Sequence, residues 1–563
     1  MNNKLLFTLA LVTGLIFADA SFAQQRKFWV MFKNKTGTPY SISTPSAYLS
    51  PKSIARRTAQ GIAINSTDLP VTPSYVNQVE AVSTVTVLYR SKWLNGVVVS
   101  IPNTSTTTAL ATINSFTFVQ SSNPVNRYKL TFPVMPKPES PDNNPSRTTN
   151  TSAYNYGASL NQAQMIGADC LHSMGFRGQG MTIAILDAGF TDVQNFDIFD
   201  SLFMQGRLLG TRDFVDGYGD TTVFTEHTHG AECLSTMAGI KSGSIIGTAP
   251  KANYWLLRTE DGGTESISEE YNWIRGAEFA DSVGADVCTT SLGYTTFDGG
   301  LNDHTYSQLN GKTAPMSIAA NLAARKGMLM FNAAGNEGCS SPSSCWYYIS
   351  VPSDADSIVT VGSVDPAGNK SGFSSFGPTA DGRKKPDLVS QGGPAVVCLY
   401  GSGCFMGNGT SFATPILAGA ATCLWQSKSM AKNMQIIQAL KATADSAANP
   451  NNRIGWGIPN MCAARTSSVL ISVGINEQAS VHDISIYPNP FSGELNIRIN
   501  DLPQQNVHVT ITNVLGQILY DQNMAVPGGG VIHLPEVAEF KAGVYVVNLN
   551  AGDTRITKKI VKQ

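Results

Sequence analysis

The chain has 563 residues, too many for one ordinary hydrophobic core, so its length predicts several domains. Hydrophobic residues make up 42% and charged residues 14% of the chain, which is typical of a globular protein and excludes a largely disordered one. The formal net charge of −1 gives no reason to expect nucleic acid as a partner.

The first residues have the pattern of a secretory signal peptide. Lys4 precedes an apolar run at 5–17, and small residues at 21 and 23 follow it. We therefore predict a signal peptide over residues 1–23 that is cleaved after Ala23. A membrane span is the weaker interpretation, because the run is short and Asp19 follows it.

Residues 24–132 are predicted to form a small α+β domain. Strand-like runs occur at 28–32, 85–89, 97–101 and 116–120, and Ser50-Pro51 is typical of a helix start. Residues 133–150 contain five prolines and are predicted to be a linker.

The first two domains have opposite charges. Residues 24–130 contain 11 basic and 2 acidic residues, a net charge of +9, whereas residues 151–468 contain 19 basic and 27 acidic residues, a net charge of −8. Opposite charges favour docking of one domain on the other. The alternative is a basic face that binds an anionic surface, or nothing in particular.

Residues 151–468 are predicted to form an α/β domain with a doubly wound, mainly parallel sheet. Mostly apolar runs at 181–186, 254–257, 328–331 and 358–361 are typical of buried parallel strands. Helices are expected at 266–282, at 317–326 and after Ser411. After a second linker at 469–483, residues 484–563 show seven short β-rich runs separated by turn signals, which predicts a small β-sandwich.

Two polar residues follow predicted buried strands. Asp187 follows the run at 181–186 directly, and Asn336 follows the run at 328–331 after small residues. Because sites in α/β folds lie at the carboxyl ends of the strands, both side chains are candidates for a functional site. The structural alternatives are that Asp187 caps a turn and that Asn336 occupies a left-handed turn position.

A histidine and a serine each precede small residues that are typical of a tightly packed helix. We favour His229 over His227, because glycine and the helical small residues follow His229. We expect Pro415 in the first turn of the helix that begins near Ser411, where its missing N–H is tolerated. A helix N-terminus suits a nucleophile whose reaction passes through an oxyanion. The alternatives are a structural histidine and a capping serine.

The order Asp187, His229, Asn336, Ser411 resembles that of the subtilisin-like serine peptidases. The stretches that carry the resemblance are 183–189, 229–232, 291–293, 333–338 and 409–415. The resemblance implies that Asp187, His229 and Ser411 form a catalytic triad and that Asn336 donates to the oxyanion. It also implies that two stretches flank a bound protein or peptide substrate, namely Ser291, Leu292 and Gly293 on one side and Ala333, Ala334 and Gly335 on the other.

The two flanking domains also resemble known ones. The first is similar to the family's prodomains, which assist folding and then inhibit, so the chain's own prodomain is an expected partner. The last, which contains Tyr487-Pro488-Asn489-Pro490, resembles the C-terminal sorting domain of the type IX secretion system. That resemblance implies export through the periplasm of a Gram-negative bacterium to the surface or the medium. The alternative is an adhesive or carbohydrate-binding β-sandwich.

The sequence departs from the family pattern at two positions. Glu232 stands where the family often has a second histidine, and Tyr294 stands where glycine often follows Ser-Leu-Gly, which could reshape the substrate groove. No calcium loop can be matched, so no metal or cofactor is assigned, although structural calcium stays open.

The nine cysteines are expected to fall into two groups. Cys339 with Cys345 and Cys398 with Cys404 bracket short loops, and we predict a disulfide in each pair. The others lie in apolar or helical contexts and are predicted to be buried thiols: Cys170, Cys233, Cys288, Cys423 and Cys462.

Together these features predict a secreted serine endopeptidase that is made as a zymogen. Two other hypotheses remain open: a non-catalytic surface protein that keeps the scaffold for binding, and an ester or amide hydrolase with the same triad.

Overall fold

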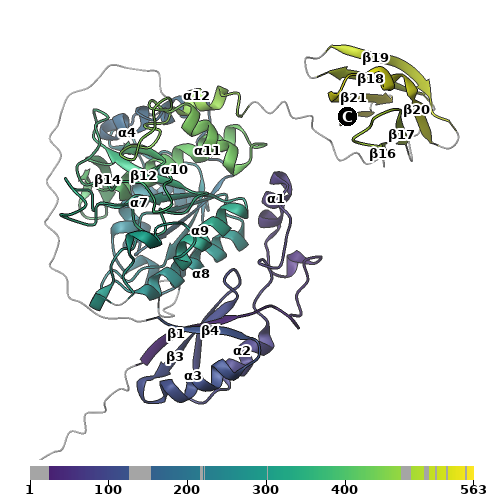
Figure 1. Ribbon diagram of the computed structural model, residues 1–563. Coiled ribbons are helices and arrows are strands. Elements are labelled where there is room, and N and C mark those ends of the chain that lie inside the picture. The colour runs from purple at the N-terminus through teal and green to yellow at the C-terminus, as the bar shows by residue number, and fades with distance from the viewer. Residues whose placement is uncertain are drawn as a thin grey trace, which may run out of the picture. The chain divides into compact units, whose positions relative to one another are not determined.

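The computed structural model describes residues 25–125, 154–215, 220, 222–300, 302–470, 484–499, 506–513, 517–527, 530–551 and 554–563 (Figure 1). The predicted signal peptide, the linker at 133–150 and most of the linker at 469–483 lie outside these residues. The chain divides into two compact units, Met1–Leu470 and Ile471–Gln563. Within the described residues, no helix combines the length and the apolar character that crossing a bilayer requires.

The N-terminal domain is a four-stranded antiparallel sheet in the order β2-β3-β1-β4. Val97 and Val99 face a core that includes residues of helices α2 and α3, whereas Val98 faces the opposite side, as the two-residue period of a strand requires. The predicted strand at 116–120 instead begins at Val119, because Phe116 caps helix α3. The bounds are β1 Gln25–Phe32, α2 Pro73–Glu80, β2 Thr86–Ser91, β3 Gly96–Pro102, α3 Thr106–Ser115 and β4 Val119–Val125.

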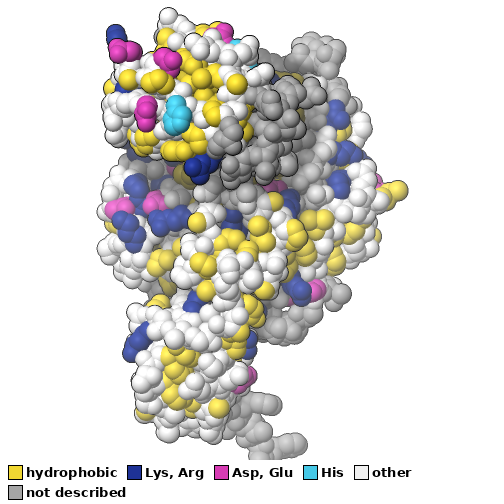
Figure 2. All heavy atoms as spheres, turned by 90° about the vertical axis from the view of Figure 1, so that its right-hand side faces the viewer, with side chains coloured by type: hydrophobic (Ala, Val, Ile, Leu, Met, Phe, Trp, Pro, Cys, Tyr) yellow, Lys and Arg dark blue, Asp and Glu magenta, His cyan; other side chains and the backbone are white. Residues whose placement is uncertain are grey.

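Helix α1 (Pro51–Gln60) belongs to the N-terminal domain in sequence but packs against the α/β domain. Figure 1 shows it set apart from the four-stranded sheet. Its N-cap Ser50 accepts a hydrogen bond from the backbone N–H of Ser53, and Gly61 ends it in the left-handed conformation. The lower part of Figure 2, which is the N-terminal domain, shows lysine and arginine side chains with few acidic ones, as the sequence charges predict.

The α/β domain is built on seven parallel strands in the order β13-β12-β11-β10-β5-β9-β6, which confirms the predicted doubly wound parallel sheet. Along β5, Ile183 and Ile185 enter the core beneath α7 and α10, whereas Ala184 and Leu186 enter the core beneath α8 and α9. The strands are β5 Thr182–Asp187, β6 Leu208–Asp213, β9 Asn253–Arg258, β10 Val287–Thr290, β11 Leu329–Ala333, β12 Val359–Val364 and β13 Leu388–Gln391.

Helices cover both faces of this sheet, and the predicted helices at 266–282, at 317–326 and after Ser411 are α8, α9 and α10. The bounds are α4 Leu160–Gln164, α5 Ala168–Ser173, α6 Asp200–Met204, α7 His229–Ala238, α8 Ile267–Val283, α9 Pro315–Arg325, α10 Thr410–Ser427, α11 Asn433–Ala442 and α12 Met461–Thr466. A two-residue pair of strands, β7 Ile240–Lys241 and β8 Ile245–Ile246, follows α7.

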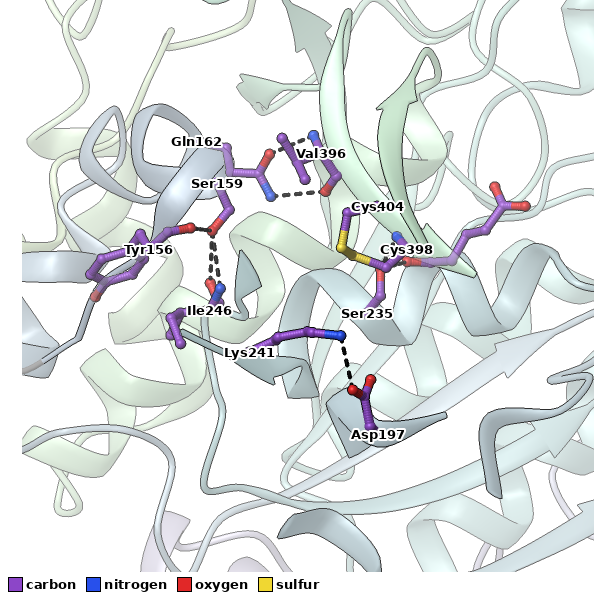
Figure 3. The surroundings of a disulfide bond; sticks show 11 residues. Tyr156, Ser159, Gln162, Asp197, Ser235, Lys241, Ile246, Val396, Cys398 and Cys404 are labelled. Atoms are coloured by element: carbon purple, nitrogen blue, oxygen red, sulfur yellow. Dashed lines mark hydrogen bonds and ion pairs between the residues drawn. A yellow bond between two sulfur atoms is a disulfide. The ribbon is translucent and has the colours of Figure 1, made fainter. Parts of the chain in front are cut away.

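The hairpin β14 (Ala395–Leu399) and β15 (Gly403–Gly407) leads into α10 and is held from two sides (Figure 3). Gln162 of α4 exchanges two hydrogen bonds with the backbone of Val396, at 2.7 and 3.1 Å. Ser235 of α7 accepts a hydrogen bond from the Cys398 N–H at 2.9 Å. The hairpin therefore joins the helix that begins with His229 to the start of the helix that contains Ser411.

Three disulfides are present among the nine cysteines. Cys339–Cys345 and Cys398–Cys404 confirm the predicted pairs. The prediction of buried thiols at Cys170 and Cys462 was wrong, because α5 and α12 bring these two residues together from positions 292 residues apart. The remaining cysteines are buried and free, as predicted: Cys233, Cys288 and Cys423.

The C-terminal unit consists of two antiparallel sheets, β16-β17-β20 and β19-β18-β21-β22, which confirms the predicted β-sandwich. Alternate residues such as Leu495, Ile497 and Ile499 fill its own core. The strands are β16 Ile484–Tyr487, β17 Leu495–Ile499, β18 Asn506–Asn513, β19 Ile518–Ala525, β20 Val531–Leu534, β21 Gly543–Ala551 and β22 Thr554–Lys562.

Candidate active site

Asp187 ends strand β5 at its carboxyl end and is fully buried. Its Oδ1 accepts hydrogen bonds from Nδ1 of His229 at 2.7 Å and from the N–H of Ala188 at 2.8 Å. Helix α7 can begin this close to β5 only because residue 230 is glycine. A Cβ on Gly230 would lie 2.4 Å from the carbonyl oxygen of Gly189 and 3.0 Å from Cβ of Asp187.

His229 is the first residue of α7, and its side chain is 24% exposed. Burial alone would lower the pKa of His229, but the charge and hydrogen bond of Asp187, helped by Glu232 and Glu260, outweigh it and raise that pKa to about 9. His227 is exposed, and its Nδ1 accepts the backbone N–H of His229 at 3.2 Å. The histidine that pairs with Asp187 is therefore the one that the sequence favoured.

Ser411 is the second residue of α10 and is 8% exposed. Its Oγ donates to the carbonyl oxygen of Ser291 at 3.2 Å, and no hydrogen bond joins it to His229 within the described part of the chain. The helix start is nevertheless next to the imidazole, because the rings of Phe412 and His229 lie 6.1 Å apart between centroids. Both Ser411 and His229 line one cleft.

Pro415 was expected in the first turn of α10, but the helix begins at Thr410, so the proline is its sixth residue. A proline there has no N–H to donate to the carbonyl four residues earlier, which is that of Ser411. Ser291 replaces the missing donor: its hydroxyl donates to the Ser411 carbonyl at 2.7 Å, and the Cys233 thiol donates to the same oxygen at 3.4 Å. Ser291 and Ser411 are thus joined by two hydrogen bonds.

Asn336 follows strand β11 and reaches the start of α10. Its Oδ1 accepts hydrogen bonds from the backbone N–H and from the hydroxyl of Thr410, each at 2.9 Å. These bonds occupy the amide oxygen and fix the orientation of the side chain. The two N–H donors of the amide are therefore left to serve another acceptor at the cleft.

The cleft between these residues has a volume of about 230 Å³. Five of the six residues predicted to flank a substrate line it, and Ala334 is instead fully buried and does not. The lining residues that sequence reasoning did not assign to the site include Glu260, Glu265, Glu337 and Ser350. Glu260 and Glu265 follow β9, so the rule that sites lie at the carboxyl ends of parallel strands could have found them.

Tyr294, which the sequence suggested could reshape the substrate groove, does not line the cleft. Its side chain is fully buried, and its hydroxyl donates to Oε2 of Glu260 at 3.2 Å. Its backbone exchanges two hydrogen bonds with Val351, at 2.9 and 3.0 Å. The residue therefore supports the cleft wall from beneath and holds Glu260 in place.

One cluster near the cleft has the composition of a metal site. The ligand atoms of Asp187, His229 and Cys233 lie within 4.8 Å of one another. Burial raises the pKa of the Cys233 thiol, which opposes the thiolate form that a metal needs. The thiol also donates to Ser411, so we interpret the cluster as an Asp–His pair with a packed thiol.

A buried Asp–His pair and a serine at a helix start, facing one cleft at the edge of a parallel sheet, define the class of this protein as a serine peptidase of the α/β type. Residues 178–457 match the sequence model of the subtilase family, peptidase S8. Residues 27–140 match the peptidase S8 propeptide domain of Bacteroidota, and residues 485–563 match the secretion system C-terminal sorting domain. The chain belongs to the subtilase family.

Curated relatives agree with this assignment. Subtilisin NAT of Bacillus subtilis subsp. natto is 29% identical over 302 residues, which are 53% of this chain and 69% of the relative. Subtilisin BL of Lederbergia lenta is 28% identical over 300 residues, 53% of this chain and 96% of the relative. Subtilisin of Bacillus pumilus is 29% identical over 282 residues, which are 50% of this chain and 89% of the relative.

The protein is therefore a serine-type endopeptidase with a propeptide and a C-terminal sorting domain. The sorting domain indicates that the protein is secreted, and the propeptide match places it among the Bacteroidota, which are Gram-negative. Both agree with the predicted localisation.

Proposed function

We propose that Ser411 is the nucleophile of this endopeptidase, with His229 as its base, Asp187 as the partner of His229 and Asn336 as an oxyanion donor. The observation that carries this proposal is the 2.7 Å bond from His229 to a fully buried Asp187, because His229 lines the same cleft as Ser411 and Asn336. On substrate binding, the Ser411 hydroxyl would turn from the Ser291 carbonyl to the imidazole. Such bonds are often loose before substrate arrives.

The reaction then follows in two halves. Oγ of Ser411 attacks the peptide carbonyl carbon while His229 takes its proton, and Asp187 stabilises the charged imidazole. The amide of Asn336 and the N–H of Ser411 would stabilise the oxyanion of the tetrahedral intermediate. His229 returns the proton to the leaving amine, which leaves an acyl-enzyme, and water activated by His229 releases the acid.

The propeptide would make this enzyme a zymogen, and the other flanking regions would direct its export. We assign residues 1–23 to the signal peptide, 24–132 to the propeptide, 151–468 to the peptidase domain and 484–563 to the sorting domain, with linkers between them. The propeptide would inhibit the peptidase until it is cut away, and the secretion machinery would recognise the sorting domain. Protein or peptide substrates bind along Ser291–Gly293 and Ala333–Gly335 in this proposal.

Kinetics of two variants test the proposal. Ser411→Ala should lower kcat for peptide hydrolysis by about 10⁶, because the covalent route is lost. Asn336→Ala should lower kcat by about 10²–10³ with little change in KM, because the donor acts mainly in the transition state. Ser402→Ala, in the exposed turn of the β14–β15 hairpin, is the matched control and should be fully active. A Ser411→Ala enzyme within tenfold of the unaltered one would rule the proposal out.

A further inference from the structure

One wall of the cleft is acidic. Glu260 and Glu265 follow strand β9, Glu337 follows Asn336, and all three line the cleft that contains Ser411. Within the described residues, none of these three carboxylates forms a salt bridge with a lysine or arginine. Arg258 is near in sequence, but it pairs with Asp213 at 2.9 Å and donates to the Ala188 carbonyl at 3.1 Å. The cleft therefore contains three carboxyl groups that no lysine or arginine of the described chain neutralises.

The surroundings of these carboxylates oppose their ionisation. Burial, followed by repulsion from Asp187, raises the pKa of Glu260 to about 7. Burial and repulsion from Glu260 and Glu269 raise the pKa of Glu265 to about 10. The Glu265 side chain accepts no hydrogen bond from any described residue, so a cation that entered the cleft would meet a carboxylate without a partner.

A buried hydroxyl group at the cleft, that of Ser350, also lacks a hydrogen-bond partner among the described residues. Ser350 is 2% exposed and lines the cleft, and its Oγ has no hydrogen-bond partner within the described residues. It lies beside Gly335, where a Cβ would be 3.4 Å from the Ser350 oxygen and 2.6 Å from Oε2 of Glu337. Because residue 335 is glycine, no side chain fills the space that both oxygens border, and both are acceptors for an N–H donor there. A buried hydroxyl without a partner is costly unless a ligand completes its bonding.

We propose that this peptidase selects substrates with a lysine or arginine at one of the two positions before the scissile bond, with Glu260, Glu265 and Glu337 as specificity-determining residues. This inference rests on the proposed peptidase function. An ammonium or guanidinium group supplies the missing positive charge and several N–H donors, whereas an apolar side chain of the same length supplies neither.

The chain itself contains a peptide of this kind. Arg127 and Lys129 follow strand β4 within four residues, near the end of the residues assigned to the propeptide, and a cut at either one would free most of the propeptide from the peptidase domain. The first substrate of the enzyme would therefore carry the side chains that the acidic wall favours.

Matched fluorogenic peptides test the preference. Lysine and its uncharged equivalent norleucine are placed in turn at each of the two positions before the scissile bond. The unaltered enzyme should prefer lysine in kcat/KM by roughly tenfold or more at one of the positions, a typical gain for one well-matched contact. A ratio near one at both positions, in an enzyme that cleaves the norleucine peptides, overturns the inference and leaves the proposed peptidase function intact. Failure to cleave any peptide counts against that function itself.

Variants of the cleft glutamates test whether their carboxylates cause the preference for lysine. Glu265→Gln and Glu260→Gln should each lower the lysine-to-norleucine ratio several-fold, and Glu265→Asp should restore part of it. Glu226→Gln is the matched control, since Glu226 is exposed and does not line the cleft. If a cleft variant loses activity on every peptide, the role of the carboxylates is tested instead by measuring the lysine-to-norleucine ratio of the unaltered enzyme at increasing ionic strength. Added salt should lower the ratio, and a ratio independent of salt overturns the role of the carboxylates.

Discussion

Ser291 carries a structural task that its place in a substrate-binding stretch does not reveal. Pro415 removes the helical donor of the Ser411 carbonyl, and the Ser291 hydroxyl replaces it at 2.7 Å. The carbonyl of Ser411, the proposed nucleophile, thus accepts from the cleft wall the hydrogen bond that Pro415 cannot donate. This arrangement leaves the first turn of α10 dependent on residue 291.

A double-mutant cycle measures that dependence. Ser291→Ala should lower the free energy of unfolding by about 1–3 kcal/mol, because it leaves a buried carbonyl without its main donor. Pro415→Ala restores a backbone N–H at the right position, so the cost of Ser291→Ala should be smaller in that background. Denaturant unfolding of Ser411→Ala protein, which cannot digest itself, gives the four values. Strict additivity would contradict the shared role.

The pH dependence of the enzyme should follow His229. Only the neutral imidazole can accept the Ser411 proton, and the pKa of His229 is raised to about 9, so kcat/KM should rise as the pH increases through about 9. The Glu232 carboxylate stabilises the charged imidazole, so Glu232→Gln should move the rise to lower pH. Glu226→Gln should leave the profile in place. An unmoved profile in Glu232→Gln would show that another group controls the rise.

At the scale of single elements, helix α1 contacts the peptidase domain. The net charges of the two domains predicted that they dock but not which residues make the contacts. Arg57 donates to the buried carboxylates of Asp68 at 2.9 Å and of Asp281, in the last turn of α8, at 2.8 Å. Arg56 bonds Asp281 at 2.5 Å, and Lys326 pairs with Asp68 at 2.9 Å. The first domain is docked on the peptidase domain, as predicted, and buried ion pairs lie between the two.

Removing one of these partners should loosen the propeptide. Arg57→Ala leaves buried carboxylates short of charge, which costs roughly 3–5 kcal/mol in comparable sites. We would cut the full Ser411→Ala chain at a specific protease site introduced within residues 133–150, and follow the propeptide by size-exclusion chromatography. It should stay bound in the unaltered sequence and in the control Arg90→Ala, whose residue is exposed, but dissociate in Arg57→Ala. Equal retention in all three would refute this anchor.

The elements also show what the sequence could and could not predict. Long apolar runs such as 181–186 became buried strands, because burial on both faces leaves a clear pattern. Strand β6 was missed because it lies at the sheet edge, where most of its residues are half-exposed or exposed. The Cys170–Cys462 pair depends on packing between segments that are distant in sequence, which no local pattern records.

At the scale of the whole molecule, export and catalysis belong to separate units. The sorting domain has its own core, which includes Phe491, Ile497 and Val547. Deleting residues 484–563 should therefore leave an active peptidase that stays in the periplasm. Fractionation with a peptide assay checks both points. Unchanged export would contradict the sorting assignment, whereas loss of all activity would contradict the independence of the two units.

We propose that four residues from separate segments of the chain make the hydroxyl of Ser411 reactive. Treatment of the mature enzyme with a fluorophosphonate, followed by peptide mass mapping, tests it most directly. We expect a single adduct on Ser411 that is lost in His229→Ala and forms much more slowly in Asp187→Asn. An enzyme that hydrolyses peptides while Ser411 stays unlabelled would contradict it.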